Sequence, residues 1–546
     1  MKRNWNKRLL SFCCSLMMVS ALNAGISVAA ENEGAETTAV DVEALAEEDL
    51  ADDADAAAVD SADEDDVITD ENTFIVGQVG YRRLESGGAA VSYVDKTATE
   101  VKIPAEAEGE KIVRIDEGAF SQCAALTSVT IPDTVTEIAA GAFYYCLALE
   151  TLEIPDSVTD IGMYAFANCY ALKSIKLPEH LKIIPEAAFY YDIGLEEIVI
   201  PEEVEKIDAQ SFVYCYSLKE LHIPASVQEI ADLAIVSCIG IECFTVDPDN
   251  PAYTVDGNGA LTSANGTRLL AYPAGLEEET YTVSKDVKII APYAFSGSVK
   301  LKSIVLPDNL TELGEGAFSE CQNLTEIVLP RGITTIPTGL FAGCVKLSNF
   351  QLASGIASIG ESAFYNCESL TELAIPDTVT TIGAWAFFGC TGLQSLRLPN
   401  TVTEIGDHAI GFQMTTSGED GAAETIIQSG FLLEGGPESE AKKYAETNGV
   451  AFKSIGLSQN AVLGIVIGGM VLLLVVVLIL LKKRGKKSAA EDAAAEVSVQ
   501  EQMNDPNYTS ILDDDDDSED PYDRSYGIST DDAEESADSD ASADSE

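Results

Sequence analysis

The stretch "IPDTVTEIAAGAFYYCLALETLE" (Ile131–Glu153) is followed without a gap by "IPDSVTDIGMYAFANCYALKSIK" (Ile154–Lys176), and both carry the same residue pattern. Aligned on the proline, copies of this pattern recur every 23 residues in two blocks. One copy has too few apolar side chains to form a core, so the copies must stack. Tandem units of one length therefore predict a solenoid. The units begin at Gly109, Pro132, Pro155, Pro178, Pro201 and Pro224, and again at Ser284, Pro307, Pro330, Ala353, Pro376 and Pro399.

Each part of the unit has the spacing of one kind of local structure. Ile175 and Leu177 are apolar at i and i+2 with Lys176 between them, as in a strand buried on one face. The proline that follows cannot donate a ladder hydrogen bond and ends the strand. The motif Ala-Phe-x-x-Cys, for example with Phe166 and Cys169, has the spacing of a short helix or 3₁₀ turn that faces the core.

The full pattern P-x-x-V-x-x-I-x-x-x-A-F-x-x-C-x-x-L-x-x-I-x-I resembles the bacterial surface leucine-rich repeat of the BspA-like family, the treponemal type with 23 residues per unit. The resemblance runs from Gly109 to Gly406. It implies an α/β leucine-rich repeat solenoid, with a parallel β-sheet on one face and short helical or 3₁₀ turns on the other. It also implies adhesion to host, matrix or neighbouring-cell components. The departures from the pattern are Asp192 in place of Cys, Ile235 and Ile410 in place of Phe, and Ser284 and Ala353 in place of Pro.

The repeats are interrupted once, between a first block over residues 109–247 and a second block over residues 284–410. The interruption, residues 248–283, contains Asp256–Gly259 and Ala264–Gly266, which are typical of hairpin turns and predict a β-rich island. The alternative is a calcium loop formed by Asp247, Asp249 and Asp256. Their spacing does not match an EF-hand, and Pro-Asp-Asn is common in turns, so the turn interpretation is favoured.

Both ends of the array need caps. Residues 74–108 predict an N-terminal β cap, because Ala90–Val94 and Thr99–Ile103 alternate like strands. Residues 411–459 predict a C-terminal cap and stalk. There, Pro437–Asn448 has the pattern of a helix stopped by Gly449, and a strand is expected from Val450 to Ile455.

The N-terminal segment has the features of a secretory signal peptide over residues 1–30. A basic start precedes the mostly apolar run Leu9–Leu22, and small residues stand before Glu31. Residues 31–73 are acidic and poor in aromatic residues, which predicts a disordered linker. The whole chain has 546 residues and a net charge of −59, from 91 acidic and 32 basic residues. Nucleic acid is thereby excluded as a partner, because phosphate contacts need Lys and Arg.

A second apolar run, Ala461–Leu481, has 21 uncharged residues and is long enough to cross a bilayer. We expect a transmembrane helix over residues 460–481. A basic cluster follows, and residues 482–546 are expected to form a cytoplasmic basic cluster and a disordered acidic tail. The expected localisation is therefore the cell membrane, single-pass, with the N-terminal ectodomain outside and the C-terminal tail in the cytoplasm. The "GIVIG" spacing of Gly464 and Gly468 allows a homodimer through the helix.

Catalysis finds no support in the sequence. The histidines are scattered, no nucleophile pairs with them at a recognisable spacing, and no phosphate-binding loop is present, so we expect neither an enzyme nor a cofactor. Most cysteines recur in step with the repeat, which predicts a buried column of reduced thiols that bond weakly to the backbone. Disulfides are the alternative. Zinc is disfavoured because no CxxC pair or Cys/His cluster occurs, and no metal site is expected.

Two rows of side chains are candidates for ligand binding. The outward strand position varies freely and includes adjacent valines at Val305 and Val328, although strands also tolerate exposed valine without a function. The position two residues after Phe is rich in tyrosine in the first block. Those rings are expected either to contact sugars or a partner protein or to shield the edge of the core. The candidate ligand-binding residues are Lys176, Val199, His222, Val305, Val328, Gln351 and Arg397 in the strand row, and Tyr145, Tyr191 and Tyr214 in the tyrosine row.

Two hypotheses for the function follow. The first is a membrane-anchored bacterial surface protein that binds an extracellular protein or glycan and mediates adhesion. The second is a transmembrane signalling or scaffold receptor that uses its acidic cytoplasmic tail, which contains Asp513–Asp517. An enzyme would need a pocket in the island.

Overall fold

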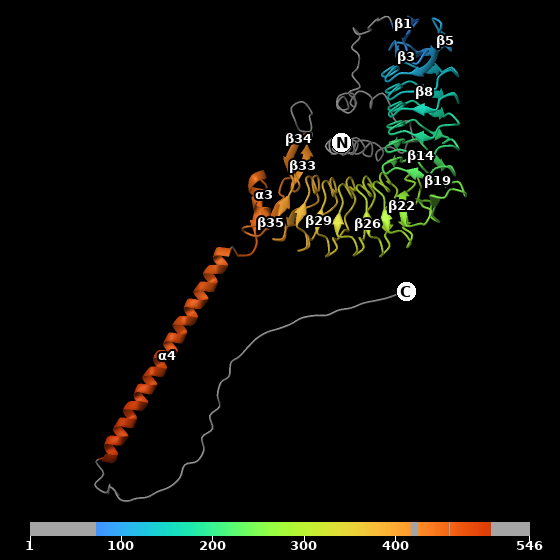
Figure 1. The fold of residues 1–546 in the computed structure, drawn as a ribbon. Coiled ribbons are helices and arrows are strands. Elements are labelled where there is room, and N and C mark those ends of the chain that lie inside the picture. Colours follow the sequence, from blue (N-terminus) through green and yellow to red (C-terminus); the bar gives the residue numbers. More distant parts are fainter. Residues whose placement is uncertain (1–71, 416–423, 458, 504–546) are drawn as a thin grey trace, which may run out of the picture. The chain divides into compact units, whose positions relative to one another are not determined.

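The computed structural model describes residues 72–415, 424–457 and 459–503 (Figure 1). It divides into two compact units, Met1–Ser458 and Gln459–Glu546. The expected leucine-rich repeat solenoid is confirmed: the first unit is a β-solenoid of about 16 turns. The expected signal peptide, nearly all of the acidic linker and the end of the acidic tail lie outside the described residues.

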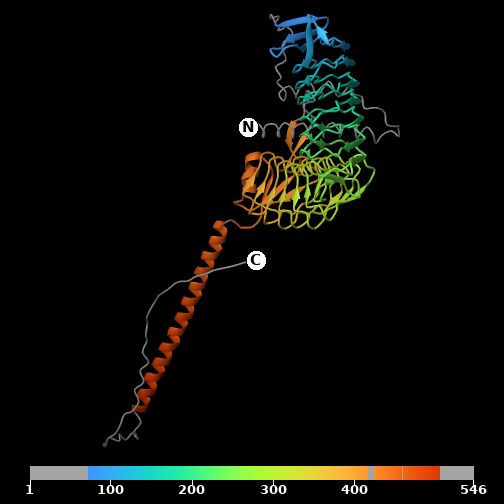
Figure 2. The same ribbon diagram turned by 45° about the vertical axis from the view of Figure 1, so that its right-hand side comes forward.

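The strands that end each repeat form the first ladder of the solenoid (Figures 1 and 2). Neighbouring strands pair in parallel, as where Ile175 lies between Leu152 and Ile198. Their apolar residues point inward because side chains alternate along a strand. The strands are β4 (Glu100–Lys102), β7 (Ser128–Thr130), β9 (Thr151–Glu153), β11 (Ser174–Lys176), β13 (Glu197–Ile198), β16 (Glu220–Ile223), β19 (Cys243–Val246), β23 (Thr280–Thr282), β25 (Ser303–Val305), β27 (Glu326–Ile327), β31 (Ser395–Arg397), β35 (Leu432–Gly435) and β36 (Phe452–Ser454).

Short strands after the proline form a second ladder, also parallel. Each contributes an isoleucine or leucine to the core, such as Ile207 and Ile359. The strands are β6 (Glu110–Ile115), β8 (Glu137–Ile138), β10 (Asp160–Ile161), β12 (Ile183–Ile184), β14 (Lys206–Ile207), β17 (Glu229–Ile230), β22 (Arg268–Ala271), β24 (Ile289–Ile290), β26 (Glu312–Leu313), β28 (Thr335–Ile336), β29 (Ser358–Ile359), β30 (Thr381–Ile382) and β32 (Glu404–Ile405).

The Ala-Phe segments form a third ladder, which we call the turn ladder. Backbone hydrogen bonds join successive turns, as from Phe143 N–H to the Ala165 carbonyl (2.8 Å), and β15 (Phe212–Val213) pairs with β18 (Ile235–Val236). The segments are tight turns and not continuous helices. The reason is that residues two before and two after Phe take left-handed backbone conformations, which interrupt a helix.

The core consists of columns of identical side chains. The phenylalanine rings stack turn upon turn, with centroids 5.7 Å apart between Phe143 and Phe166 and 5.6 Å between Phe166 and Phe189. The expected thiol column is also present. Cys146 Sγ donates to the Phe120 carbonyl (3.3 Å), and Cys344 Sγ donates to the Phe318 carbonyl (3.1 Å). The predicted bond between thiol and backbone is thus confirmed, and burial raises the pKa of the Cys390 thiol to about 12.

The predicted island is partly a solenoid turn. Its hairpin turns are confirmed, because β20 (Tyr253–Val255), β21 (Leu261–Ser263) and β22 pair antiparallel in sequence. From β22 onward, however, the chain rejoins the solenoid. Tyr272 stacks on Phe295, 23 residues later (5.3 Å), and Tyr281 in β23 pairs with Ile304. The inserted element is therefore the hairpin before Arg268, and the repeat resumes before residue 284.

Caps close both ends of the array. At the N-terminus, β1 (Thr73–Val76), β2 (Val79–Arg83) and β3 (Ala89–Val94) pair antiparallel, β3 runs parallel to β6, and β5 (Glu106–Ala107) joins β6. At the other end, β33 (Phe412–Thr415) and β34 (Glu424–Ile427) form an antiparallel pair. The helix α3 (Glu440–Asn448) ends at Gly449 in a left-handed conformation, and β36 follows, as expected.

The second unit contains the helix α4 (Gln459–Met503). Ala461–Arg484 within it has a mean hydropathy of 3.2 and is long and apolar enough to cross a membrane. The expected disorder after the basic cluster is wrong for the residues up to Met503, which continue the helix. The sequence "SAAEDAAAEV" explains this, because Ala and Glu are strong helix formers.

Candidate ligand-binding surface

Thr282, Val305 and Val328 lie in one line across the first ladder, and we call them the valine patch. The pairing of β23 with β25 sets Thr282 opposite Val305. β25 pairs with β27 so that Ile304 faces Ile327, and each valine follows its buried isoleucine directly. The valines therefore point to the outer face of the sheet. The adjacency expected from the 23-residue step is confirmed.

The valines of this patch are strongly exposed. The exposed fraction is 81% for Val328 and 49% for Val305. A single exposed valine is ordinary, but neighbouring ones form an apolar surface that a ligand can cover at little desolvation cost. Asn349 Nδ2 donates to Glu326 Oε2 beside the patch (3.4 Å), so this carboxylate is already engaged.

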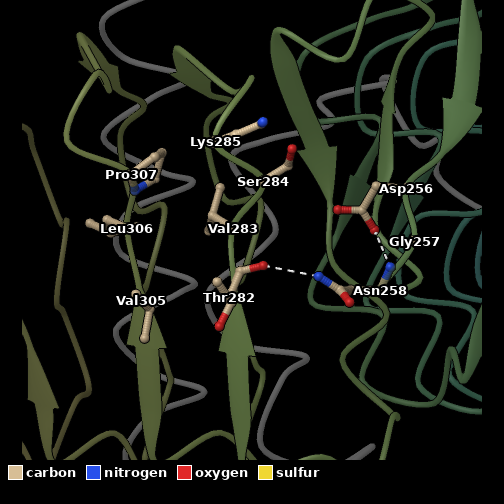
Figure 3. A pocket seen from close by; sticks show the side chains of 10 residues that line it. All are labelled: Asp256, Gly257, Asn258, Thr282, Val283, Ser284, Lys285, Val305, Leu306 and Pro307. Carbon is tan, nitrogen blue, oxygen red and sulfur yellow. Dashed lines mark hydrogen bonds between the residues drawn. The ribbon is translucent and has the colours of Figure 1, made fainter.

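A cleft of about 430 Å³ adjoins the patch and shares Thr282 and Val305 with it (Figure 3). Its walls come from the island turn Asp256–Asn258 and from the ends of β23 and β25, Thr282–Lys285 and Val305–Pro307. Figure 3 shows the turn facing the end of β23, with the end of β25 beyond it. The inserted hairpin thus forms one wall, and the regular repeat forms the other.

Hydrogen bonds fix the turn that lines the cleft. Asp256 Oδ1 accepts from the N–H groups of Asn258 (2.9 Å) and Ala260 (3.0 Å), and Oδ2 accepts from the Tyr281 hydroxyl (2.8 Å). Asn258 Nδ2 donates to the Thr282 carbonyl (3.1 Å). Burial, and then the bond to Asp256, raise the pKa of Tyr281. The turn interpretation is confirmed for Asp256, because its oxygens hold the loop and its neighbour in place.

The cleft has one exposed cation, Lys285, opposite the engaged Asp256. Among the described residues, no ion pair to Lys285 is found. The ammonium group therefore remains available to a carboxylate or carbonyl of a ligand that covers the valine patch.

In the first block, the candidate residues of the strand row do not form an apolar patch. Val199 is 79% exposed, but its neighbours in the row are the polar Lys176 and His222. Lys176 is ion-paired with Glu153 (2.9 Å), and His222 Nδ1 lies 2.9 Å from Thr245 Oγ1. Similar pairs between adjacent turns recur nearby, as between Lys173 and Glu150 (3.0 Å). The first-block strand face is thus hydrated and charged, unlike the valine patch.

The remaining strand-row candidates lie on one side of the patch. Gln351 is exposed and lies next to Val328, because each follows by two residues a member of the bridge between Glu326 and Asn349. Arg397 is exposed in β31, where it faces Glu434 of β35. The described strands do not join Arg397 to the valines, so the structure does not bring it into one site with them.

The residues of the tyrosine row differ in their exposure. Tyr145 and Tyr191 are half-buried, whereas Tyr214 is only 1% exposed. The ligand-binding role expected for Tyr214 is therefore wrong as a direct contact. Its ring packs among those of Tyr190, Tyr191 and Tyr216, which cover it.

The cleft residues Asn258, Thr282 and Lys285 are not among the ligand-binding residues expected from the sequence. The signal that could have found Thr282 is its distance of 23 residues from Val305, which continues the outward row into the island. No repeat pattern marks Asn258, because it belongs to the inserted hairpin.

Comparisons with known proteins agree with this fold. The family described as "BspA type Leucine rich repeat region (6 copies)" matches residues 100–247 and 279–416. A leucine-rich cell surface protein from Faecalibacterium prausnitzii is 28% identical, with a TM-score of 0.52, and the alignment covers 61% of this chain and 94% of that one. No curated protein matches the chain.

Two further solved structures are similar at lower identity. A leucine-rich repeat protein from Eubacterium ventriosum is 23% identical, with a TM-score of 0.42, over 61% of this chain and 92% of that one. The pneumococcal vaccine antigen PcpA is 18% identical, with a TM-score of 0.45, over 70% of this chain and 99% of that one.

Proposed function

Because the chain belongs to the family of BspA-type leucine-rich repeat proteins, we propose that it is a membrane-anchored surface protein that binds extracellular protein ligands through the valine patch and the adjoining cleft. Bacterial surface proteins of this family are in general protein-binding, and leucine-rich repeat proteins are typically scaffolds without catalytic activity.

The adjacent exposure of Val305 and Val328 carries the proposal. An interface needs an apolar centre that excludes water, with polar groups at its rim. Val305 and Val328 supply the centre. The cleft supplies a concavity for an anchoring side chain of the ligand, and Lys285 supplies a charge at the rim. The stacked backbone beneath them is hydrogen-bonded from turn to turn, so little conformational freedom is lost on binding.

The apolar part of α4 supports the proposed anchor. Ala461–Arg484 is long enough for one membrane span, and Lys482, Lys483 and Arg484 at its end favour a cytoplasmic position for that end. The repeats then face the outside of the cell, where a protein ligand is accessible to them.

The test compares two valines in the same row of the repeat. Full-length protein in detergent is screened against an array of extracellular-matrix proteins, as the parent, as Val328→Glu and as Val199→Glu. We expect Val328→Glu to weaken binding at least about tenfold, because it places a charge in the apolar centre. Val199→Glu serves as the control, since it is equally exposed but stands between Lys176 and His222. Retention of every interaction by Val328→Glu would reject the patch as the binding site.

A further inference from the structure

Tyrosine rings form a continuous chain of contacts along the turn ladder of the first block, and we call it the tyrosine strip. Tyr145 contacts Tyr170 (6.3 Å between centroids), and Tyr170 contacts Tyr191 (6.2 Å). Tyr191 contacts Tyr214 (4.7 Å), and Tyr214 contacts Tyr216 (5.8 Å). Tyr190 packs against both Tyr191 (5.7 Å) and Tyr214 (6.1 Å). The strip therefore extends over four successive turns.

The backbone of the strip is strained at the tyrosines. The φ angle is 60° at Tyr145, 63° at Tyr191 and 60° at Tyr214. A bulky side chain rarely adopts this left-handed conformation, because its Cβ crowds the backbone. Strain of this kind persists where the side chain is needed for another reason, and it concentrates at functional sites.

The second block has the same backbone conformation without tyrosine. At the same position, two residues after Phe, it carries Gly297, Gly343 and Gly389, with φ angles of 71–74°, and Glu320 and Asn366, with φ angles of 56° and 54°. Glycine occupies this conformation without a steric cost. The conformation is therefore common to the repeats, whereas tyrosine at this position is specific to the first block.

Packing explains the ring of Tyr214 but not its hydroxyl. Tyr214 is almost fully buried, and its hydroxyl makes no hydrogen bond with any described residue. A buried hydroxyl without a partner destabilises a fold that uses it for packing alone. Phenylalanine would pack as well and leave no polar group unsatisfied. Burial keeps this hydroxyl away from a surface ligand, so contacts with a ligand on the strip fall to the half-buried rings of Tyr190, Tyr191 and Tyr216, which pack against Tyr214.

We propose that the tyrosine strip is a second binding site, separate from the valine patch, that takes an extended neutral polysaccharide. Adjacent turns are about 4.8 Å apart, close to the length of one sugar ring in an extended chain. Tyrosine offers an apolar ring face to the C–H groups of a sugar and a phenol to its hydroxyls.

The negative charge of the first block favours uncharged polysaccharides over anionic ones. Residues 109–247 carry 23 Asp and Glu but only 7 Lys and Arg. This field repels uronic acids, sulfates and sialic acids and leaves uncharged sugars unaffected. A protein partner is the competing occupant, and the experiment separates it from a glycan.

The test measures binding of oligosaccharides to full-length protein in detergent by calorimetry. The probes are β-1,4-linked N-acetylglucosamine and glucose oligomers of one to six units, with hyaluronan fragments as the anionic comparison. We expect affinity for a neutral series to rise with length and to level off at about four units, one for each turn of the strip. Hyaluronan fragments should not bind.

Matched glycine substitutions distinguish the effect of losing a tyrosine ring from the effect of relieving the left-handed backbone strain. Tyr191→Gly relieves the left-handed backbone and removes a ring, and it should weaken binding about tenfold or more. Gln122→Gly relieves the same strain (φ 60°) at an exposed position outside the strip, and it should leave binding unchanged. Val328→Glu should also leave sugar binding unchanged, so failure here and failure of the valine patch are distinguishable.

Three results would overturn the proposal. One is that no neutral oligosaccharide binds. Another is that Tyr191→Gly binds like the parent, or that Gln122→Gly loses binding to the same degree. The third is that Tyr191→Gly abolishes binding of a matrix protein and affects no sugar, which would assign the strip to a protein partner.

Discussion

Asp192 replaces the column cysteine in one turn, and it is fully buried. Its Oδ1 accepts a hydrogen bond from the Cys169 N–H (2.8 Å), whereas Oδ2 has no partner among the described residues. Burial, and then the nearby Cys169, raise the pKa of this carboxyl well above its ordinary value of 3.8. Burial therefore favours the protonated, uncharged form of this side chain in the folded protein.

The replacement Asp192→Cys should stabilise the protein at neutral pH. Since the carboxyl has a higher pKa when folded, its stabilising effect is complete below about pH 3.8 and is lost as the pH rises through the folded value. The variant should gain about 1–3 kcal/mol in free energy of unfolding at pH 7, and the gain should shrink toward pH 4. Urea unfolding of both proteins at several pH values measures it.

The reciprocal variant Cys146→Asp is the control for this prediction. It places an acid in the same column and should lower the unfolding midpoint more at pH 7 than at pH 4. A gain from Asp192→Cys that does not vary with pH would contradict the assignment of a buried neutral acid.

At the scale of elements, Tyr272 shows how the inserted hairpin is joined to the repeats. Tyr272 takes the place of a column phenylalanine, and its N–H donates to the Ala294 carbonyl (2.7 Å), as the column phenylalanines do to the next turn. Its buried hydroxyl has no hydrogen-bond partner among the described residues, and burial raises its pKa to about 12. The ring packs in the phenylalanine column, but the hydroxyl makes no hydrogen bond with the described residues that would stabilise the column.

The substitution Tyr272→Phe should therefore raise the free energy of unfolding, by about 1–2 kcal/mol, because it removes an unsatisfied polar group and keeps the ring. Tyr272→Ala should lower it by about 3–5 kcal/mol, since a cavity would open between the hairpin and Phe295. The denaturant midpoints of the two variants, compared with that of the parent, measure both changes in stability. A loss of stability in Tyr272→Phe would mean that the hydroxyl has a role in this fold.

The elements differ in how far the sequence could predict them. The strand and phenylalanine columns follow from apolar spacing alone, and Phe143 and Phe166 stack as expected. The solenoid turn within the island was missed because it has tyrosine at Tyr272 and Tyr281 and no cysteine. The extension of α4 to Met503 differs from the expected disorder because the acidic composition of this segment indicates disorder, whereas the helix propensity of its alanines favours a helix.

The candidate site was predicted only in part. A fixed 23-residue step is enough to place Val305 beside Val328. The cleft depends on where the hairpin sets Asp256 and Asn258, and no local pattern encodes that position. The burial of Tyr214 likewise depends on rings from neighbouring turns, which the sequence identifies but does not orient.

At the scale of the whole molecule, the proposed anchor makes a simple prediction. The double substitution Leu473→Arg with Leu474→Arg places two charges inside the apolar stretch of α4, at a cost of about 2.5–3.5 kcal/mol each. We expect the protein to leave the membrane fraction of cells, as measured by centrifugation and blotting.

The control for the anchor is Ala490→Arg, which lies in the same helix beyond the apolar stretch. It should leave the protein in the membrane fraction. If the double variant also stays there, α4 is not what holds the protein to the membrane.

The buried thiol column can be used to follow local unfolding of the solenoid turn by turn. Of the described cysteines, Cys243 alone is exposed, while Cys123, Cys146, Cys169, Cys215, Cys238, Cys321, Cys344, Cys367 and Cys390 are buried. An alkylating reagent attacks only a thiolate that it can reach, so each buried thiol is modified only when its own turn unfolds locally. Because these thiols stand about one to a turn, the order in which they acquire the label would reveal whether the array frays from its caps or ruptures first at the inserted hairpin.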